Sequence, residues 1–127
     1  MMVSAKQHMT TRARGAEAEE LAAAFLEREG YRIVARNVRF DVGEIDLVAW
    51  DGDVLCFVEV RARASGSQIN PLETIDARKQ SRVVRAASRY LETLKGVWPA
   101  MRFDAVGIWL GTPPTFELVK AAFEAGA

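Results

Sequence analysis

The sequence predicts a single α/β domain in which a mixed β-sheet is flanked by helices. Half of the 127 residues are hydrophobic, which suits one core and leaves little room for a second. Helical and strand patterns alternate in the order α-β-β-β-α-β-β. The third and fourth strands are joined through a helix, and such a crossover places parallel strands in the same sheet as the antiparallel ones.

Each element has its own signal in the chain. The first helix is predicted over residues 15–29, because apolar residues recur there at helical spacing and Gly30 follows at the usual C-terminal position. The other predicted elements are strands 31–40, 42–50 and 54–63, a helix 76–95, and strands 101–110 and 115–119. Residues 1–14 contain no comparable pattern. We therefore expect a flexible N-terminal arm before a domain that spans residues 15–127.

The composition limits the functional classes. The chain has 17 basic and 17 acidic residues, and this balance argues against binding nucleic acid by net charge alone. The charges are unevenly placed, because residues 15–60 hold eleven acids and four bases, whereas residues 61–95 hold eight bases and three acids. The single cysteine, Cys56, excludes an intramolecular disulfide. No apolar run reaches the roughly 20 residues that cross a bilayer, so we expect a cytoplasmic protein with no membrane partner.

A hairpin is predicted where Asp51-Gly52 separates two strands. A two-residue turn there would place Asp46 opposite Phe57 and Glu44 opposite Glu59. Side chains alternate between the two faces of a strand, so one face of the hairpin is entirely apolar. That face comprises Ile45, Leu47, Ala49, Cys56, Val58 and Val60.

The other face of the hairpin gathers charge at the end far from the turn, where Glu44, Asp46, Glu59 and Arg61 lie. Burying such charges without partners is costly, and neighbouring carboxylates repel one another. A divalent cation such as Mg²⁺ or Mn²⁺ would resolve both problems, because hard cations take oxygen ligands. The alternative is a structural cluster in which Arg61 pairs with Glu59.

Both helices could add to this site. Glu17 and Glu19 flank the apolar stripe of the first helix, and the helical wheel does not choose between them. On the second helix, arginines recur opposite the apolar face, which suits either phosphate contacts or a solvated surface. These arginines are Arg78, Arg82, Arg85 and Arg89, with Lys79 at the boundary. Gln80 falls on the apolar side and needs a hydrogen-bond partner, for which the acidic cluster is a candidate.

The segments 43–48 (GEIDLV) and 57–63 (FVEVRAR) resemble the YraN-type family of small, endonuclease-like bacterial proteins. The resemblance extends from Gly15 to about Phe123 and includes Lys79-Gln80 and the segment 102–104 (RFD). It implies a restriction-endonuclease-like fold of the PD-(D/E)xK nuclease superfamily, akin to Holliday-junction resolvases. The implied activity is a Mg²⁺-dependent endonuclease acting on structured or branched DNA.

The resemblance also implies roles for particular residues. Asp46 and Glu59 would bind the metal, and the first-helix glutamate of the resolvases corresponds to Glu19. Position 61 would help activate or position the attacking water, with Gln80 in support. The pattern usually has lysine at this position, so Arg61 is a departure. A non-catalytic nucleic-acid-binding or adaptor protein that keeps the fold is therefore the alternative, and the oligomeric state is open, a homodimer included.

Arginine at position 61 has a physical consequence. Its guanidinium stays charged and can hold a carboxylate in two parallel hydrogen bonds. We expect such a clamp on Glu59 to compete with the metal. The sequence thus predicts a slow or inactive nuclease, in which Arg61→Lys raises metal affinity.

Overall fold

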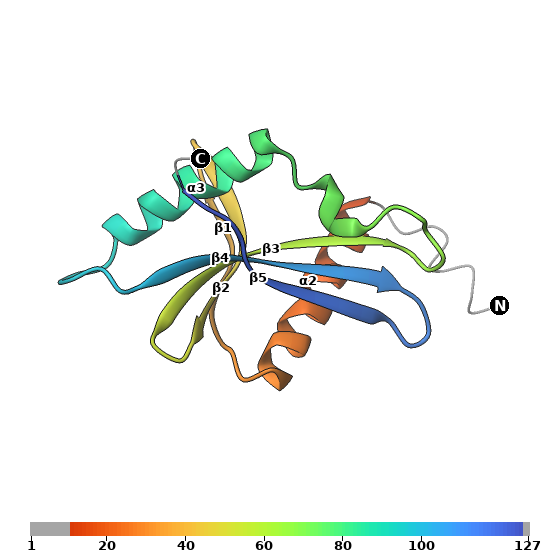
Figure 1. The fold of residues 1–127 in the computed structure, drawn as a ribbon. Helices are drawn as coiled ribbons and strands as arrows, with labels where there is room; N and C mark the ends of the chain where they lie inside the picture. Colours follow the sequence, from red (N-terminus) through yellow and green to blue (C-terminus); the bar gives the residue numbers. More distant parts are fainter. Residues whose placement is uncertain (1–10, 126–127) are drawn as a thin grey trace.

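The computed structural model describes residues 11–125, with side chains from residue 15 onward. Within these described residues, two helices, one 3₁₀ turn and five strands follow one another in the predicted α-β-β-β-α-β-β order (Figure 1). They are α2 (Thr11–Arg28), β1 (Arg32–Phe40), β2 (Gly43–Asp51), β3 (Val54–Ala64), η1 (Pro71–Thr74), α3 (Ala77–Glu92), β4 (Met101–Leu110) and β5 (Thr115–Phe123).

Two boundaries differ from the sequence prediction by four residues, and the others by three or fewer. Helix α2 already includes residues 11–14, which the sequence assigned to the N-terminal arm, while residues 1–10 of that arm lie outside the described residues. Strand β5 continues to Phe123 instead of ending at Val119. The extension pairs Phe123 with Phe103 of β4, and their rings stack with centroids 5.1 Å apart.

The strands form one mixed sheet in chain order, β1 to β5. All neighbours are antiparallel except β3 and β4, which run parallel because α3 carries the chain across between them. Helix α2 packs against one face of the sheet and α3 against the other (Figure 1). The predicted mixed α/β fold is confirmed. No helix in the described part of the chain is long and apolar enough to span a membrane.

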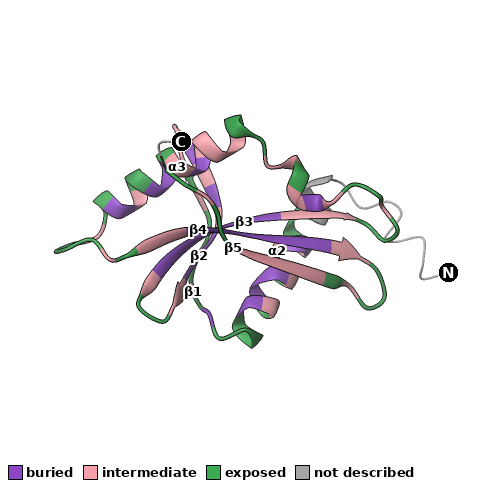
Figure 2. Ribbon diagram, viewed as in Figure 1, coloured by how far each residue is buried: buried purple, intermediate pink, exposed green. Residues whose placement is uncertain are grey.

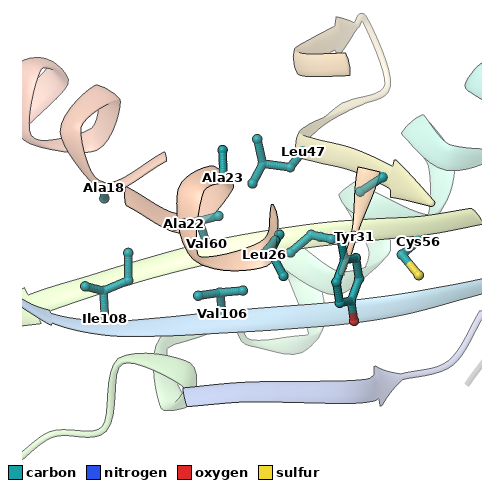
Figure 3. Packing of buried hydrophobic residues seen from close by; sticks show 12 residues of the cluster. Ala18, Ala22, Ala23, Leu26, Tyr31, Leu47, Cys56, Val60, Val106 and Ile108 are labelled. Atoms are coloured by element: carbon teal, nitrogen blue, oxygen red, sulfur yellow. The ribbon is translucent and has the colours of Figure 1, made fainter. Parts of the chain in front are cut away.

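Two hydrophobic clusters fill the space between sheet and helices, so the buried residues lie mainly along the central strands and the inner faces of the helices (Figure 2). The cluster under α2 joins Ala22 and Leu26 to Leu47, Val58 and other alternate residues of the sheet (Figure 3). The cluster under α3 includes Val48, Leu55, Phe57, Val83, Ala87 and Leu91. The predicted division of the hairpin into two faces therefore holds along most of its length.

The predicted register of the hairpin is wrong by two residues. Asp51 pairs with Val54, so the turn is Gly52-Asp53, with Gly52 in the left-handed region at φ +60°. Val48, not Asp46, lies opposite Phe57. A shift of two residues keeps every side chain on its predicted face, which explains why the face assignment survived the error.

The face assignment fails at Ile45. This residue was expected beside Leu47 but packs in the cluster under α3. The pairs between β2 and β3 end at Leu47 and Val58, so the start of β2 is not held in the hairpin's alternation. It is instead pressed against α3, because a Cβ added at Gly43 would lie 2.0 Å from the carbonyl oxygen of Arg82. Only glycine permits this approach, which carries the start of β2 to the helix.

Candidate active site

Glu59 of β3 is the central feature of the candidate site. Its side chain has no exposed surface, yet neither carboxylate oxygen has a hydrogen-bond partner within the described residues. Two cations approach its Oε2 atom: Lys79 Nζ at 3.4 Å and Arg61 Nη2 at 3.8 Å. Burial, followed by the neighbouring carboxylate of Asp46, raises the pKa of Glu59 far above its usual value. Glu59 is thus a buried acid whose charge is incompletely compensated.

Asp46 lies where β2 separates from β3. Its Oδ2 accepts a hydrogen bond of 2.8 Å from the backbone N–H of Val60, and this bond fixes the carboxylate at the end of the paired strands. Asp46 is close enough to Glu59 and Glu19 to raise the pKa of both. It therefore links a carboxylate under α3 to one carried by α2.

Glu19 reaches this group from α2. Burial and then the charge of Asp46 raise the pKa of Glu19, while Asn37 and Arg39 of β1 oppose the shift. Asn37 holds a left-handed backbone at φ 51°, which asparagine tolerates better than most residues. Of the two glutamates that the helical wheel left open, Glu19 is the one that shares a cleft with Asp46.

Lys79 occupies a position that the sequence did not indicate. It was placed at the boundary of the arginine stripe, but its side chain is only 17% exposed and turns toward the acids. Its Nζ donates to Glu44 Oε1 at 3.2 Å and lies 3.4 Å from Glu59. The hydrogen bond and the charge of Lys79 lower the pKa of Glu44. A lysine ammonium is therefore present beside Glu59, although it comes from α3 and not from position 61.

Two expected contacts are not formed. The clamp of Arg61 on Glu59 is absent, because the 3.8 Å ion pair contains no hydrogen bond and the buried Arg61 Nε has no partner in the described part of the chain. Gln80 does not contact the acids either. Its Nε2 donates to the carbonyl oxygen of Ile75 at 3.2 Å, so it closes the loop before α3. Lys79, one residue earlier, makes the contact expected of Gln80.

A cleft of about 700 Å³ opens beside these acids. One wall is α2, which contributes Glu19, and the other is the end of β3. Asp46 lies between the walls, and Arg61 and Arg63 line the β3 side. The remaining lining residues are small or apolar: Gly15, Ala18, Val60, Ala62, Ala64 and Leu110. Two acidic residues, Glu19 and Asp46, and two arginines, Arg61 and Arg63, thus line the same cleft.

Arg63 was missed as a site residue. Strand alternation places it on the same side as Arg61, and this signal was available in the sequence. Arg63 lines the same cleft as Glu19 and Asp46 because β2 separates from β3 before this point. The sequence pattern does not reveal where the two strands separate. Across residues 15–125, no acid lies within ion-pair distance of Arg63.

The residues fit a divalent metal in part. Among the described residues, no three histidine, cysteine, aspartate or glutamate side chains form a ready-made metal cage. Mg²⁺ does not require one, because it usually keeps several waters and binds one or two carboxylates together with substrate phosphate. Asp46 and Glu59 can supply two carboxylates. The unpartnered oxygens of Glu59 are the observation that a cation would explain.

The predicted nucleic-acid-binding stripe lies on the outer side of α3. Arg78, Arg85 and Arg89 are exposed, whereas Arg82 is half-buried above Gly43. Arg89 pairs with Asp41 at 3.1 Å, which reduces the charge it offers to a ligand. Because α3 and α2 cover opposite faces of the sheet, the stripe and the α2 wall of the cleft belong to different sides of the molecule.

A second buried acid, Asp104 of β4, has the opposite environment. It accepts hydrogen bonds from Tyr31 Oη at 2.8 Å, from Arg102 Nε at 2.7 Å and Nη2 at 2.9 Å, and from the Ala121 N–H at 3.0 Å. Although burial opposes ionisation, these donors, led by Arg102, lower the pKa of Asp104. Arg102 also reaches Asp51 at 2.7 Å. This cluster ties the start of β4 and the end of β5 to the hairpin turn, and it was not predicted.

Comparison with known proteins agrees with the resemblance noted in the sequence. A profile described as "Uncharacterised protein family UPF0102" matches residues 18–108. A UPF0102 protein of Chlorobaculum parvum is 46% identical over 116 residues, covering 86% of this chain and 90% of the relative. UPF0102 proteins of Anaeromyxobacter dehalogenans and Symbiobacterium thermophilum are 48% and 47% identical, covering 87% of this chain and 83% and 96% of the relatives. The chain therefore belongs to the UPF0102 family, the YraN-type family that its motifs resemble.

Proposed function

We propose that this protein is a divalent-metal-dependent endonuclease that acts on structured or branched DNA. The observation that carries the proposal is Glu59, a fully buried acid next to a second acid, Asp46. No residue with a described side chain donates a hydrogen bond to Glu59. Asp46 connects the buried Glu59 to the cleft, which Asp46 lines together with Glu19. Perturbed acids beside a cleft are typical of functional sites. The YraN-type resemblance supplies the reaction class, phosphodiester hydrolysis.

The site residues have distinct roles in this proposal. Asp46 and Glu59 would hold Mg²⁺ or Mn²⁺, which when bound polarises a phosphate and promotes ionisation of the attacking water. The N–H of Val60 keeps Asp46 oriented toward the metal position. Glu19, whose raised pKa favours its protonated form, borders the cleft and can exchange a proton with solvent there.

The cations act on negative charge. Arg61 lines the cleft and would stabilise charge that builds up on the phosphate during cleavage. Lys79 holds Glu44 by a hydrogen bond and faces Glu59, so it positions the start of β2 relative to β3. The arginines of α3 would contact the DNA backbone farther from the cleavage point. They are Arg78, Arg82, Arg85 and Arg89.

A second candidate is a non-catalytic nucleic-acid-binding or adaptor protein. The observation in its favour is that Glu59 faces two cations, Lys79 and Arg61, which partly satisfy its charge without a metal. Such pairs would let the fold persist after catalysis was lost. The carboxylates of Asp46 and Glu59 weigh against this alternative only if they bind a metal ion.

A cleavage assay separates the two candidates. The protein is incubated with a branched DNA and Mg²⁺ or Mn²⁺, alongside Asp46→Asn and the matched control Asp53→Asn, which changes an exposed acid in the hairpin turn. We expect cleavage by the wild type and the control but not by Asp46→Asn. DNA binding without cleavage in either metal would support the adaptor function and overturn the nuclease proposal.

A further inference from the structure

The cleft is bounded by a strand edge that has no neighbouring strand. Pairs between β2 and β3 end at Val58, whereas pairs between β3 and β4 continue to Ala64. Residues 59–64 of β3 therefore leave one edge unpaired by any strand that the structure describes. Asp46 takes the first N–H on this edge, that of Val60. Because alternate residues of a strand direct their N–H groups to the same side, the N–H of Ala62 faces the cleft as well.

Two arginines accompany this edge. Arg61 and Arg63 line the cleft, and the buried Nε of Arg61 lacks a hydrogen-bond acceptor in the described part of the chain. No carboxylate within the described residues pairs with Arg63. Arg63 has no described acid within ion-pair distance, and the one acid near Arg61 is the buried Glu59 at 3.8 Å. Such guanidinium groups, beside an open row of N–H groups, can donate hydrogen bonds to successive phosphates.

The size of the cleft restricts what can enter. A volume of about 700 Å³ lies within the roughly 300–1,000 Å³ typical of pockets that enclose small ligands. A nucleotide or two has this size, whereas a double helix is far larger. The apolar lining formed by Ala18, Val60 and Leu110 can contact sugar and base, while the arginines follow the backbone.

We propose that this cleft binds an unpaired DNA strand, with Arg63 and Arg61 on its phosphates, so that the scissile nucleotide must lie in a single-stranded flap, fork or gap. This inference rests on the proposed function for the reaction but concerns the substrate's form. No aromatic side chain of residues 15–125 lines the cleft, so stacking by these residues contributes little. Affinity then comes from phosphate contacts, which makes it dependent on salt and tolerant of sequence.

The test measures binding separately from cleavage. Fluorescence anisotropy in EDTA compares labelled oligothymidylate, a flapped duplex and a blunt duplex over a range of salt concentrations. The variants are Arg63→Ala and Arg32→Ala, the latter an exposed arginine of β1 at the opposite, hairpin-turn end of the sheet. We expect oligothymidylate and the flap to bind roughly tenfold more tightly than the blunt duplex. Arg63→Ala should reduce the salt slope for the single strand by about 0.7, whereas Arg32→Ala leaves it unchanged.

Each other outcome has a defined meaning. Equal binding of the blunt duplex, or an unchanged slope in Arg63→Ala, overturns the inference even if the protein cleaves duplex DNA. Tighter binding of oligouridylate or of an acidic peptide, which could add to the open edge of β3, overturns the choice of DNA. Selective, Arg63-dependent binding of the single strand without cleavage in Mg²⁺ or Mn²⁺ leaves this inference standing and removes the proposed nuclease function.

Discussion

Two fully buried acids lie almost side by side in this sheet but on opposite faces. Asp104 of β4 is level with Val58 of β3, one residue before Glu59. Asp104 accepts four hydrogen bonds and has a lowered pKa, whereas Glu59 accepts none from the described residues and has a raised pKa. The burial of the two acids is the same, so the donors around each acid determine the difference.

This contrast distinguishes a structural carboxylate from a candidate functional one. A buried charge that is fully hydrogen-bonded stabilises the fold through its partners, and Asp104 unites Tyr31, Arg102 and the backbone of Ala121. A buried charge without donors destabilises the fold until something binds it. We infer that Glu59 is retained for binding and Asp104 for stability, and each prediction below tests one side of this comparison.

The largest expected effect concerns Asp104. Asp104→Asn removes the charge that pairs with Arg102, so we expect it to lower the free energy of unfolding by about 3 kcal/mol at neutral pH. Glu59→Gln keeps the shape of a buried carboxyl whose pKa, raised to about 9, leaves it protonated at neutral pH. This variant should therefore leave stability unchanged or raise it. Urea unfolding of both variants, with Asp53→Asn as an exposed control, measures the difference. Equal losses in both variants would contradict the distinction.

Of the two buried acids, only Glu59 should take part in metal binding, together with Asp46. Mn²⁺ at about 100 times its dissociation constant should stabilise the wild type by about 2.7 kcal/mol. Asp46→Asn and Glu59→Gln should each abolish this increase and the calorimetric signal of binding. Asp51→Asn changes an acid of the Asp104 cluster, which is not expected to bind metal. This variant should keep both the stabilisation by Mn²⁺ and the calorimetric signal of binding. Binding that persists in the double variant of Asp46 and Glu59 would place the metal elsewhere.

The fold was predictable from the sequence to the extent that it follows from periodicity. Apolar alternation determined which hairpin residues face each helix, even with the register wrong by two, because that error preserves alternation. The candidate site depends on contacts that no periodic sequence pattern predicts. The direct contact of Gly43 with the Arg82 backbone brings α3 to the acids, and the rotamer of Lys79 decides which cation meets Glu59. The Asp104 cluster joins residues 73 positions apart, a distance that no local pattern spans.

The two acids should also respond oppositely to pH. The lowered pKa of Asp104 contributes stability that is complete above its unfolded value of 3.8 and is lost as the pH falls through the folded value. Because the pKa of Glu59 is raised in the folded state, the folded protein keeps a proton on this residue above pH 4.5, the ordinary pKa at which the unfolded chain releases it. Stability should therefore fall as pH rises from about 5 toward neutral, by up to about 1.4 kcal/mol per pH unit.

Unfolding measured across this range in the wild type and in Glu59→Gln isolates the second effect. We expect the decline with rising pH to disappear in the variant, because it has no proton to release. The steep loss of stability below pH 3.8 should remain, since Asp104 is intact. A decline that is equal in both proteins would show that another group is responsible.

A smaller effect is expected from the arginines of α3, which lie on the outer side of the helix away from both acids. Replacing Arg82 and Arg85 with alanine should weaken DNA binding and reduce its salt slope by about 0.9 for each lost contact with duplex phosphate. Stability and Mn²⁺ affinity should change little. A salt slope that stays constant while the fold is intact would identify the stripe as a solvated surface.

The smallest expected effect is that of Arg61→Lys. The sequence suggested a two-hydrogen-bond clamp on Glu59, but the closest approach is 3.8 Å, and Lys79 is nearer at 3.4 Å. Lysine at position 61 would therefore exchange one distant cation for another. We expect Mn²⁺ affinity to change by less than about threefold, or ~0.7 kcal/mol. Lys79→Met, by contrast, removes the nearer cation from both Glu59 and Glu44 and should change affinity and stability measurably. If Arg61→Lys instead raises Mn²⁺ affinity tenfold or more while Lys79→Met has no effect, then Arg61 governs the charge of Glu59, and the clamp forms in solution.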